Sequence, residues 1–256
     1  MSCLNPRIID WRGKRVWLVG ASSGIGAALA SQLQALGASV ALSARREVPL
    51  LKLAGEGDRV MSLDVNDPVA MRETWETLIR EWGEIDFIVY SAGVYQPMRA
   101  WNIDLSVVRA TLQTNLQGVY NLLSVVTPYF LDRQTGGLCL IASVAGYTGL
   151  PKALVYGPSK AAVINLAQIL YTDLSPRGIG VYLVNPGFVE TRLTMQNDFN
   201  MPALISPAKA AQEIIRGISK GRFEIDFPRR FTWWMKRLSR LPDRLRFYLL
   251  KKAAES

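Results

Sequence analysis

The sequence of 256 residues contains no histidine and only two cysteines, Cys3 and Cys139. Zinc sites take most of their ligands from these two residue types, so we expect no metal site. Two cysteines so far apart give no sign of a disulfide framework, which favours a reducing compartment. Without imidazole, the chain also lacks the side chain that most often moves protons near neutral pH, so acid–base chemistry needs another group.

Long apolar segments are also missing. The first 20 residues lack the apolar core of about 7–15 residues that marks a signal peptide. Residues 110–131 contain no charged side chain, but glutamines, asparagines, Gly118 and Pro128 interrupt them, as in a buried helix of a globular protein. We therefore expect a cytoplasmic protein, with peripheral attachment to a membrane left open.

What the sequence has in excess is positive charge, and nearly all of it lies at the C-terminus. The formal net charge is +9, and residues 229–252 contribute +8 through nine Lys or Arg and one acid, Asp243. Apolar side chains recur there at helical spacing on both sides of Pro242, at Trp234, Leu238, Leu241, Leu245 and Tyr248. We predict a basic amphipathic helical extension over residues 229–256.

Three interpretations of this extension stay open. A basic amphipathic helix with aromatic side chains is typical of segments that lie on an anionic membrane surface, here through residues 229–252. Alternatively, its apolar face packs on the rest of the chain or on a second copy. Nucleic-acid binding is the weakest alternative, because one basic tail brings no known reading module, and we expect no nucleic-acid partner.

Ahead of the extension, β-rich runs alternate with amphipathic helical runs. This alternation predicts an α/β fold, namely a single-domain Rossmann fold with a doubly wound parallel sheet of about seven strands and helices on both faces. We assign residues 1–228 to this domain, including a substrate loop over 188–206. The predicted strands are 15–20, 39–44, 59–65, 85–93, 137–143, 179–187 and 223–227.

The stretch VGASSGIG, residues 19–26, joins the first predicted strand to the first helix. Gly20 permits a tight turn, Gly24 lets the backbone approach a pyrophosphate, and Gly26 allows close packing of helix and strand. The free N–H groups and partial positive charge of the helix N-terminus favour phosphate groups. At this place in an alternating chain, the loop predicts a dinucleotide site rather than an ordinary turn.

The stretch YGPSK, residues 156–160, places Tyr156 and Lys160 on one face of a predicted helix. The ordinary tyrosine pKa of about 10 is too high for efficient proton transfer near neutral pH. A nearby ammonium favours phenolate and lowers that pKa. The pair is therefore predicted to act as an acid–base group without imidazole.

The spacing G-x-x-x-G-x-G, together with Y-x-x-x-K, resembles that of the short-chain dehydrogenase/reductase family over roughly residues 14–226. The resemblance implies hydride transfer between a nicotinamide and a carbonyl/alcohol pair, with Tyr156 as general acid/base. It further implies that Ser143 holds the substrate oxygen, that Lys160 also bonds the nicotinamide ribose, and that Asn115 supports a proton relay.

The residues after the second predicted strand indicate which nucleotide binds. NAD-preferring sites usually carry an acid there, whereas this chain has Arg45 and Arg46, and Arg45 is placed to pair with a 2′-phosphate. We therefore expect NADP, with NAD less favoured. Tyr90 and Ser91 replace the two asparagines of the family's N-N-A-G signature. With the other family matches, the expected cofactor-binding residues are Gly20, Ser22, Ser23, Gly24, Ile25, Gly26, Arg45, Arg46, Asp64, Val65, Ala92, Gly93, Tyr156, Lys160, Pro186, Gly187, Val189 and Thr191.

Apolar side chains are expected around the substrate, which favours an apolar aldehyde or ketone, although a generic hydrophobic lid explains them equally well. The helical runs 104–132 and 154–174 resemble the pair through which family members associate, which implies a homodimer or homotetramer. The alternative function is a non-catalytic NADP-binding sensor or a membrane-associated scaffold. The expected substrate-side residues are Tyr95, Val144, Tyr147, Phe188, Leu193, Met195, Phe199 and Met201.

Overall fold

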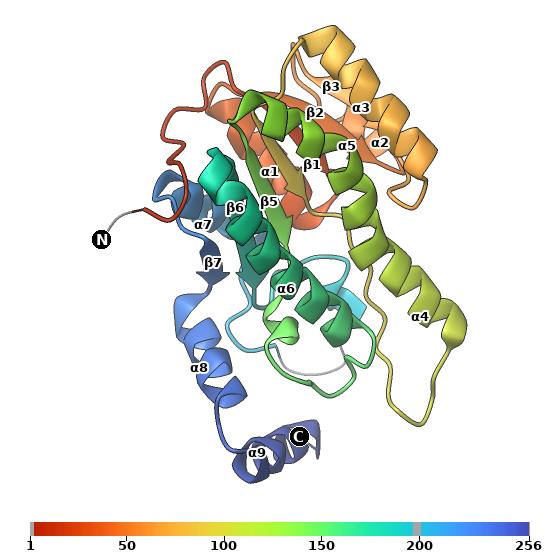
Figure 1. Cartoon of the computed structure of the whole chain (residues 1–256). Helices are drawn as coiled ribbons and strands as arrows, with labels where there is room; N and C mark the ends of the chain where they lie inside the picture. Colours follow the sequence, from red (N-terminus) through yellow and green to blue (C-terminus); the bar gives the residue numbers. More distant parts are fainter. Residues whose placement is uncertain (1–2, 197–200, 256) are drawn as a thin grey trace.

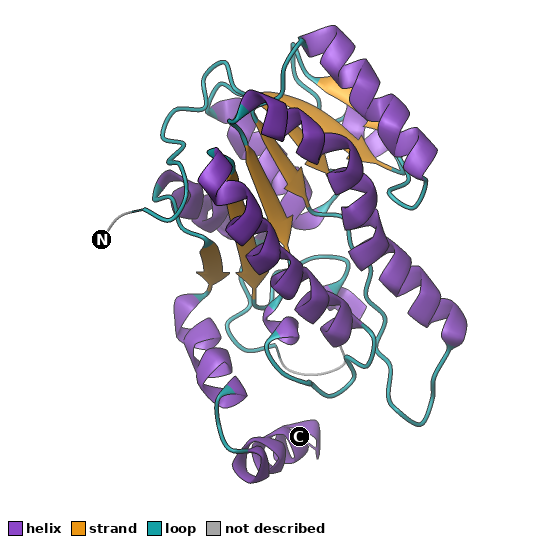
Figure 2. Cartoon of the chain, in the orientation of Figure 1, coloured by secondary structure: helices purple, strands orange, loops and turns teal. Residues whose placement is uncertain are grey.

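A parallel sheet forms the centre of the computed structural model, which describes residues 3–196 and 201–255. Figure 1 and Figure 2 show its seven strands, whose order is β3-β2-β1-β4-β5-β6-β7. All neighbouring strands are parallel, so their carboxyl ends share one edge of the sheet. The strands are β1 (Arg15–Val19), β2 (Ser39–Ala44), β3 (Arg59–Ser62), β4 (Phe87–Tyr90), β5 (Gly137–Ile141), β6 (Gly180–Pro186) and β7 (Glu224–Phe227).

Helices cover both faces of the sheet, and each face has its own apolar core. One core includes Trp75 of α3 (Pro68–Trp82), Val126 of α5 (Gly118–Arg133) and Leu166 of α6 (Tyr156–Leu174). The other includes Leu33 of α1 (Gly24–Ala35) and Ile214 of α7 (Pro207–Ser219). The predicted single-domain, doubly wound fold is therefore confirmed. The helices on these faces are α1 (Gly24–Ala35), α2 (Glu47–Leu51), α3 (Pro68–Trp82), α4 (Leu105–Leu112), α5 (Gly118–Arg133), α6 (Tyr156–Leu174) and α7 (Pro207–Ser219).

Helix starts follow the capping signals of the sequence. The Asp67 carboxylate accepts hydrogen bonds from the N–H groups of Val69 at 2.9 Å and Ala70 at 3.1 Å, and proline occupies the first turn of α3. The Ser206 hydroxyl accepts from the N–H of Lys209 at 3.2 Å at the start of α7. These caps fix where two of the connecting segments end and their helices begin.

Two local features were not predicted. The short α2 follows β2 directly, where the sequence indicated no helix. A π-helical turn, Gln113–Gln117, interrupts the helical run expected over 104–132 and separates α4 from α5. Such turns are frequent at functional sites because they redirect a side chain without ending the helix, and here the redirected and buried residue is Asn115.

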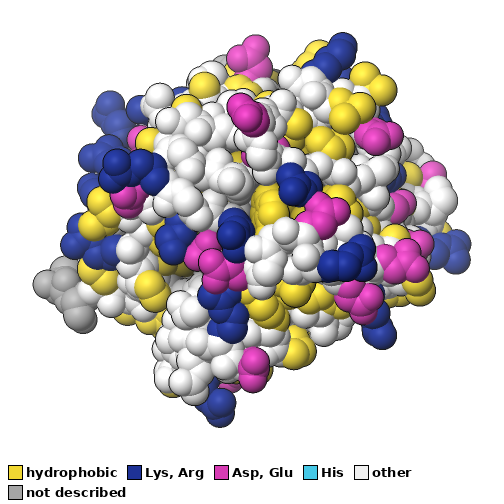
Figure 3. Space-filling model, turned by 90° about the horizontal axis from the view of Figure 1, so that it is seen from above, with side chains coloured by type: hydrophobic (Ala, Val, Ile, Leu, Met, Phe, Trp, Pro, Cys, Tyr) yellow, Lys and Arg dark blue, Asp and Glu magenta, His cyan; other side chains and the backbone are white. Residues whose placement is uncertain are grey.

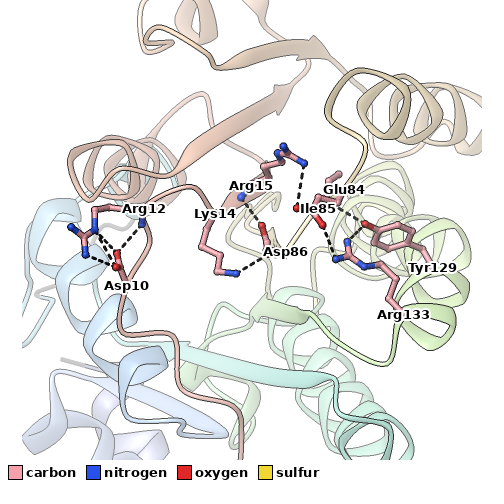
Figure 4. Close-up of polar contacts among 9 residues, drawn as sticks. All are labelled: Asp10, Arg12, Lys14, Arg15, Glu84, Ile85, Asp86, Tyr129 and Arg133. Carbon is pink, nitrogen blue, oxygen red and sulfur yellow. Dashed lines mark hydrogen bonds and ion pairs between the residues drawn. The ribbon is translucent and has the colours of Figure 1, made fainter.

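At the amino ends of the strands, charged side chains tie β1 to the segment before β4, as Figure 4 shows. The Asp86 carboxylate accepts from the Lys14 ammonium and from the N–H of Arg15, each at 2.9 Å. Glu84 accepts from the Arg133 guanidinium at the end of α5 at 2.8 Å. These partly buried contacts set the alignment of β1 and β4, and so the alignment of their carboxyl ends.

The C-terminal extension starts at the outer edge of the sheet, and Figure 1 draws it beyond the carboxyl ends of the strands. In α8 (Arg229–Ser239), Lys236 pairs with Glu224 of β7 at 2.8 Å and with Asp226 at 3.3 Å. Pro242 lies between α8 and α9 (Asp243–Glu255), so the extension consists of two helices. In the part of the chain that the structure describes, no helix is long and apolar enough to cross a membrane.

Candidate active site

A cavity of about 730 Å³ opens at the carboxyl ends of the strands. Its walls are the segments that follow β1 to β6, together with the start of α6. Every cofactor-binding residue predicted from the sequence lines it except Gly26, and Ser143 lines it as well. Asn115 does not reach the wall. The parallel sheet thus brings together predicted residues as far apart in the chain as Gly20 and Thr191, which are separated by 171 positions.

The glycine loop brings β1, β4 and α1 into close contact. Gly20 has a φ of +95°, and a Cβ on it would lie only 2.4 Å from the amide nitrogen of Ala92. A Cβ on Gly26 would lie 2.2 Å from the carbonyl oxygen of Gly20. Neither position accepts a side chain unless the backbone shifts. Because the loop stays this tight, the N-terminal turn of α1 borders the cavity, and its free N–H groups fit an anion.

The cavity wall beyond β2 is positively charged. Arg45 and Arg46 follow β2 and are both exposed, and the Arg46 guanidinium donates to the Ser22 hydroxyl at 3.4 Å. Among the described lining residues the one acid is Asp64, which accepts from the N–H of Asn66 at 3.0 Å. Two guanidinium groups and a serine hydroxyl at one corner could hold a phosphate ester, so these residues fit a phosphorylated dinucleotide.

Ser143, Tyr156 and Lys160 meet in the same cavity. Ser143 follows β5 and hydrogen-bonds the Tyr156 side chain. Lys160 lies one helical turn after Tyr156, and its ammonium donates to the carbonyl of Ile141, the last residue of β5, at 2.9 Å. The ammonium nitrogen is 5.7 Å from the centre of the Tyr156 ring. The end of β5 therefore positions both the hydroxyl and the ammonium against the phenol.

Burial displaces the pKa values of both ionisable side chains. Loss of water raises the pKa of Tyr156 to about 12, although the hydrogen bond with Ser143 acts in the opposite direction. Loss of water lowers the pKa of Lys160 to about 8. In the chain by itself, desolvation of the phenolate is the largest cause of the shift in the Tyr156 pKa, and the Lys160 ammonium does not lower that pKa below its ordinary value. A further positive charge in the cavity would be needed to favour phenolate.

Asn115 holds the segment after β4. Its side-chain oxygen accepts from the N–H of Val94 at 2.8 Å, and its amide group donates to the Val94 carbonyl at 3.0 Å and to the Ser159 hydroxyl at 3.1 Å. A Cβ on Gly93 would lie 3.4 Å from the Asn115 oxygen and 3.5 Å from the Lys160 nitrogen. Asn115 thus lies beside Lys160 without bonding it, and it fixes the cavity wall from behind.

The substrate side differs in part from the expectation. Tyr95 and Leu193 line the cavity, and the Tyr95 ring packs edge-on against Tyr156 at 5.0 Å between ring centres. Val144 and Tyr147 do not line it, and the Tyr147 hydroxyl donates to Glu224 at 2.5 Å instead. Among the other expected residues, Phe188, Met195 and Met201 do not line the cavity, and Phe199 lies outside the described residues.

Several polar residues of the wall were missed, namely Thr114, Arg192, Thr194 and Gln196. Thr194 closes a turn after β6, because its hydroxyl accepts from the N–H of Thr191 at 2.9 Å and donates to the Val189 carbonyl. A threonine three residues after another is the only sequence signal for this turn. Thr114 precedes Asn115 in the π-helical turn. No residue pattern predicts such a turn, so nothing in the sequence indicated that Thr114 lines the cavity.

Comparisons with known proteins agree with this geometry. A family model described as short chain dehydrogenase matches residues 14–201. An uncharacterized oxidoreductase of Myxococcus xanthus is 34% identical over 217 residues, which cover 82% of this chain and 86% of that protein. A 3-oxoacyl-(acyl-carrier-protein) reductase of Thermotoga maritima is 30% identical over 217 residues, covering 82% and 85%. A solved short-chain dehydrogenase of Streptomyces avermitilis shares the fold, with a TM-score of 0.78 and 23% identity over 88% of this chain and 92% of that one. The chain therefore belongs to the short-chain dehydrogenase family.

Proposed function

We propose that the chain is an NADP(H)-dependent oxidoreductase that transfers a hydride between the nicotinamide and a carbonyl/alcohol substrate, with Tyr156 as general acid/base. The observation that carries this proposal is the cluster of Ser143, Tyr156 and Lys160 in one cavity with the glycine loop. Each residue type is common alone, but their convergence beside a dinucleotide loop supports catalysis over a binding role.

In the reducing direction, bound NADPH would supply the hydride that adds to the carbonyl carbon. The Ser143 hydroxyl donates a hydrogen bond to the carbonyl oxygen and stabilises the negative charge that develops there. The Tyr156 phenol gives that oxygen its proton, and the product is the alcohol. The raised pKa of Tyr156 suits this role, because the phenol carries its proton near neutral pH.

We propose an apolar carbonyl substrate for this reaction. Tyr95 lies against Tyr156, and Val94 and Leu193 add apolar surface to the same cavity. Apolar side chains beside Tyr156 favour an aldehyde or ketone on an apolar chain over a sugar, because the hydroxyl groups of a sugar lose hydration against them.

Tyr156→Phe tests the proposed acid directly, because it removes the proton donor and keeps the ring. We expect kcat for NADPH-dependent reduction of medium-chain aldehydes and ketones to fall by about 10²–10⁴-fold, while NADPH still binds. Steady-state assays and calorimetric titration measure the two effects. Tyr147→Phe is the matched control, since its hydroxyl lies outside the cavity wall, and it should keep kcat. Equal kcat in Tyr156→Phe and the parent chain would contradict the proposal.

Arg45→Ala tests the cofactor preference. Loss of one charge-assisted contact to a 2′-phosphate is worth about 1.5–3 kcal/mol, so the Kd for NADPH should rise by about tenfold or more. The Kd for NADH should stay unchanged, because NADH lacks that phosphate. Lys52→Ala, which removes an exposed cation just after α2, serves as the charge control. An equal loss of affinity for both nucleotides would contradict a role for Arg45 in selecting NADP.

We also propose that the chain forms a homodimer or homotetramer through α4, α5 and α6. Large apolar side chains are exposed on these helices at Leu112, Tyr120 and Ile169, which supports burial against a second copy. Light scattering should return a mass of at least twice the chain mass of 28.4 kDa at micromolar concentration. Tyr120→Glu should lower that mass, and a monomer at all concentrations of the parent chain would refute the proposal.

The extension, residues 229–256, is proposed to contact an anionic membrane surface, as a unit that adds to the domain over 1–228. Trp234 and Tyr248 are 67% and 62% exposed. Guanidinium groups lie next to exposed rings, Arg237 at 4.5 Å from the Trp233 ring centre and Arg246 at 4.9 Å from that of Phe247. Cations beside exposed aromatic rings suit the bilayer interface, where phosphates and acyl chains meet.

The combined variant Trp234→Ser, Phe247→Ser, Tyr248→Ser tests this contact in the full chain. The parent chain should sediment with vesicles that contain phosphatidylglycerol, and the variant should lose most of that binding because it removes the apolar part of the contact. Trp101→Ser removes a more exposed ring from the loop before α4 and should bind as the parent does. Unchanged sedimentation of the triple variant would exclude the extension as the contact.

A further inference from the structure

A second pocket, of about 360 Å³, lies between α7 and the start of α8. Two of its cations, Lys209 and Arg216, lie in α7 two helical turns apart, and a third, Lys220, follows the last residue of that helix. Arg222 in the turn after α7 and Arg229 at the first position of α8 complete the rim. Figure 3 shows Lys and Arg side chains gathered on the left of the view, the side on which Figure 1 draws α7.

Positive charge in this pocket is not balanced by the protein. Glu213 is the one acid among the lining residues, and it pairs with Lys209 at 3.6 Å. Within the described residues, Arg216, Lys220, Arg222 and Arg229 form no ion pair. The pKa of Lys220 is lowered by this crowding of positive charge. The largest cause is the charge of Arg216, followed by burial and by the charges of Arg222 and Arg229. An anion between these groups would relieve their mutual repulsion.

The arrangement differs from an ordinary solvated basic face. A solvated face spreads its cations outward from one element, whereas these come from a helix, a turn and the next helix and surround one hollow. Ile205, Phe227 and Pro228 supply apolar surface inside it. No residue of this pocket lines the candidate active site, so it is a separate site.

We infer that this pocket binds a phosphate-bearing anion. Guanidinium groups bind phosphate oxygens through paired, charge-assisted hydrogen bonds, and three arginines surround the space. The same chemistry has two sources, a soluble phosphate compound or the headgroup of an anionic lipid. The second source is compatible with membrane contact by the extension, because Arg229 belongs to both the pocket and α8. The inference does not depend on the proposed oxidoreductase activity.

The first arm of the test uses inorganic pyrophosphate and the full chain, with NADPH in excess so that the dinucleotide site does not take up the pyrophosphate. The variant Arg216→Gln, Lys220→Gln, Arg222→Gln removes three pocket cations, and Lys52→Gln, Arg72→Gln, Arg80→Gln removes three exposed cations beside or within α2 and α3. Calorimetric titration at fixed ionic strength should give a Kd about tenfold or more weaker in the pocket variant. The control should match the parent, and thermal unfolding confirms that both variants are folded.

The second arm distinguishes the sources by sedimentation with vesicles of phosphatidylcholine, with and without phosphatidylglycerol. If the ligand is a lipid headgroup, the pocket variant also loses binding to the phosphatidylglycerol vesicles, whereas the control does not. If the ligand is soluble, only pyrophosphate binding falls. The inference is overturned if the folded pocket variant binds both pyrophosphate and vesicles as the control does, or if the parent chain binds neither.

Discussion

The close approach of β1, β4 and α1 at Gly20 is the constraint on which the rest of the site depends. A side chain at Gly20 would meet the backbone of Ala92 at 2.4 Å, so anything larger than glycine would push β1 from β4 and move the N-terminus of α1. Because all strands are parallel, the segments that carry Arg45, Ser143 and Lys160 leave the sheet at the same edge. The Asp86 contacts at the other edge hold the same two strands in register.

Burial then decides which protonation states the site favours. Burial raises the pKa of Tyr156 and lowers the pKa of Lys160, because loss of water destabilises the charged form of each side chain, the phenolate and the ammonium. The chain by itself therefore presents a neutral phenol, which is the proton-donating form. Charges interact more strongly at this low effective dielectric than in water, so a charged group that enters the cavity acts strongly on this pair.

The sequence predicted those parts of the molecule that depend on local chemistry. Alternating patterns give the strands, and the spacing of Tyr156 and Lys160 places them on one helix face. Contacts between distant segments could not be predicted in this way. Tyr147 turns from the cavity because Glu224, 77 positions later, accepts its hydroxyl. The π-helical turn that aims Asn115 at Val94 has no residue signature, and the Lys160 bond to the Ile141 carbonyl needs β5 and α6 in place.

The most direct test of the account follows the hydride itself. NADPH that carries deuterium at both positions of nicotinamide C4 is incubated with the chain and a panel of medium-chain aldehydes and ketones. Mass spectrometry then measures the deuterium content of the alcohols. The account predicts that the parent chain forms at least one alcohol with a single deuterium on the former carbonyl carbon, and that Tyr156→Phe forms this alcohol far more slowly. Firm binding of NADPH by the parent chain without any labelled alcohol across the panel would contradict it.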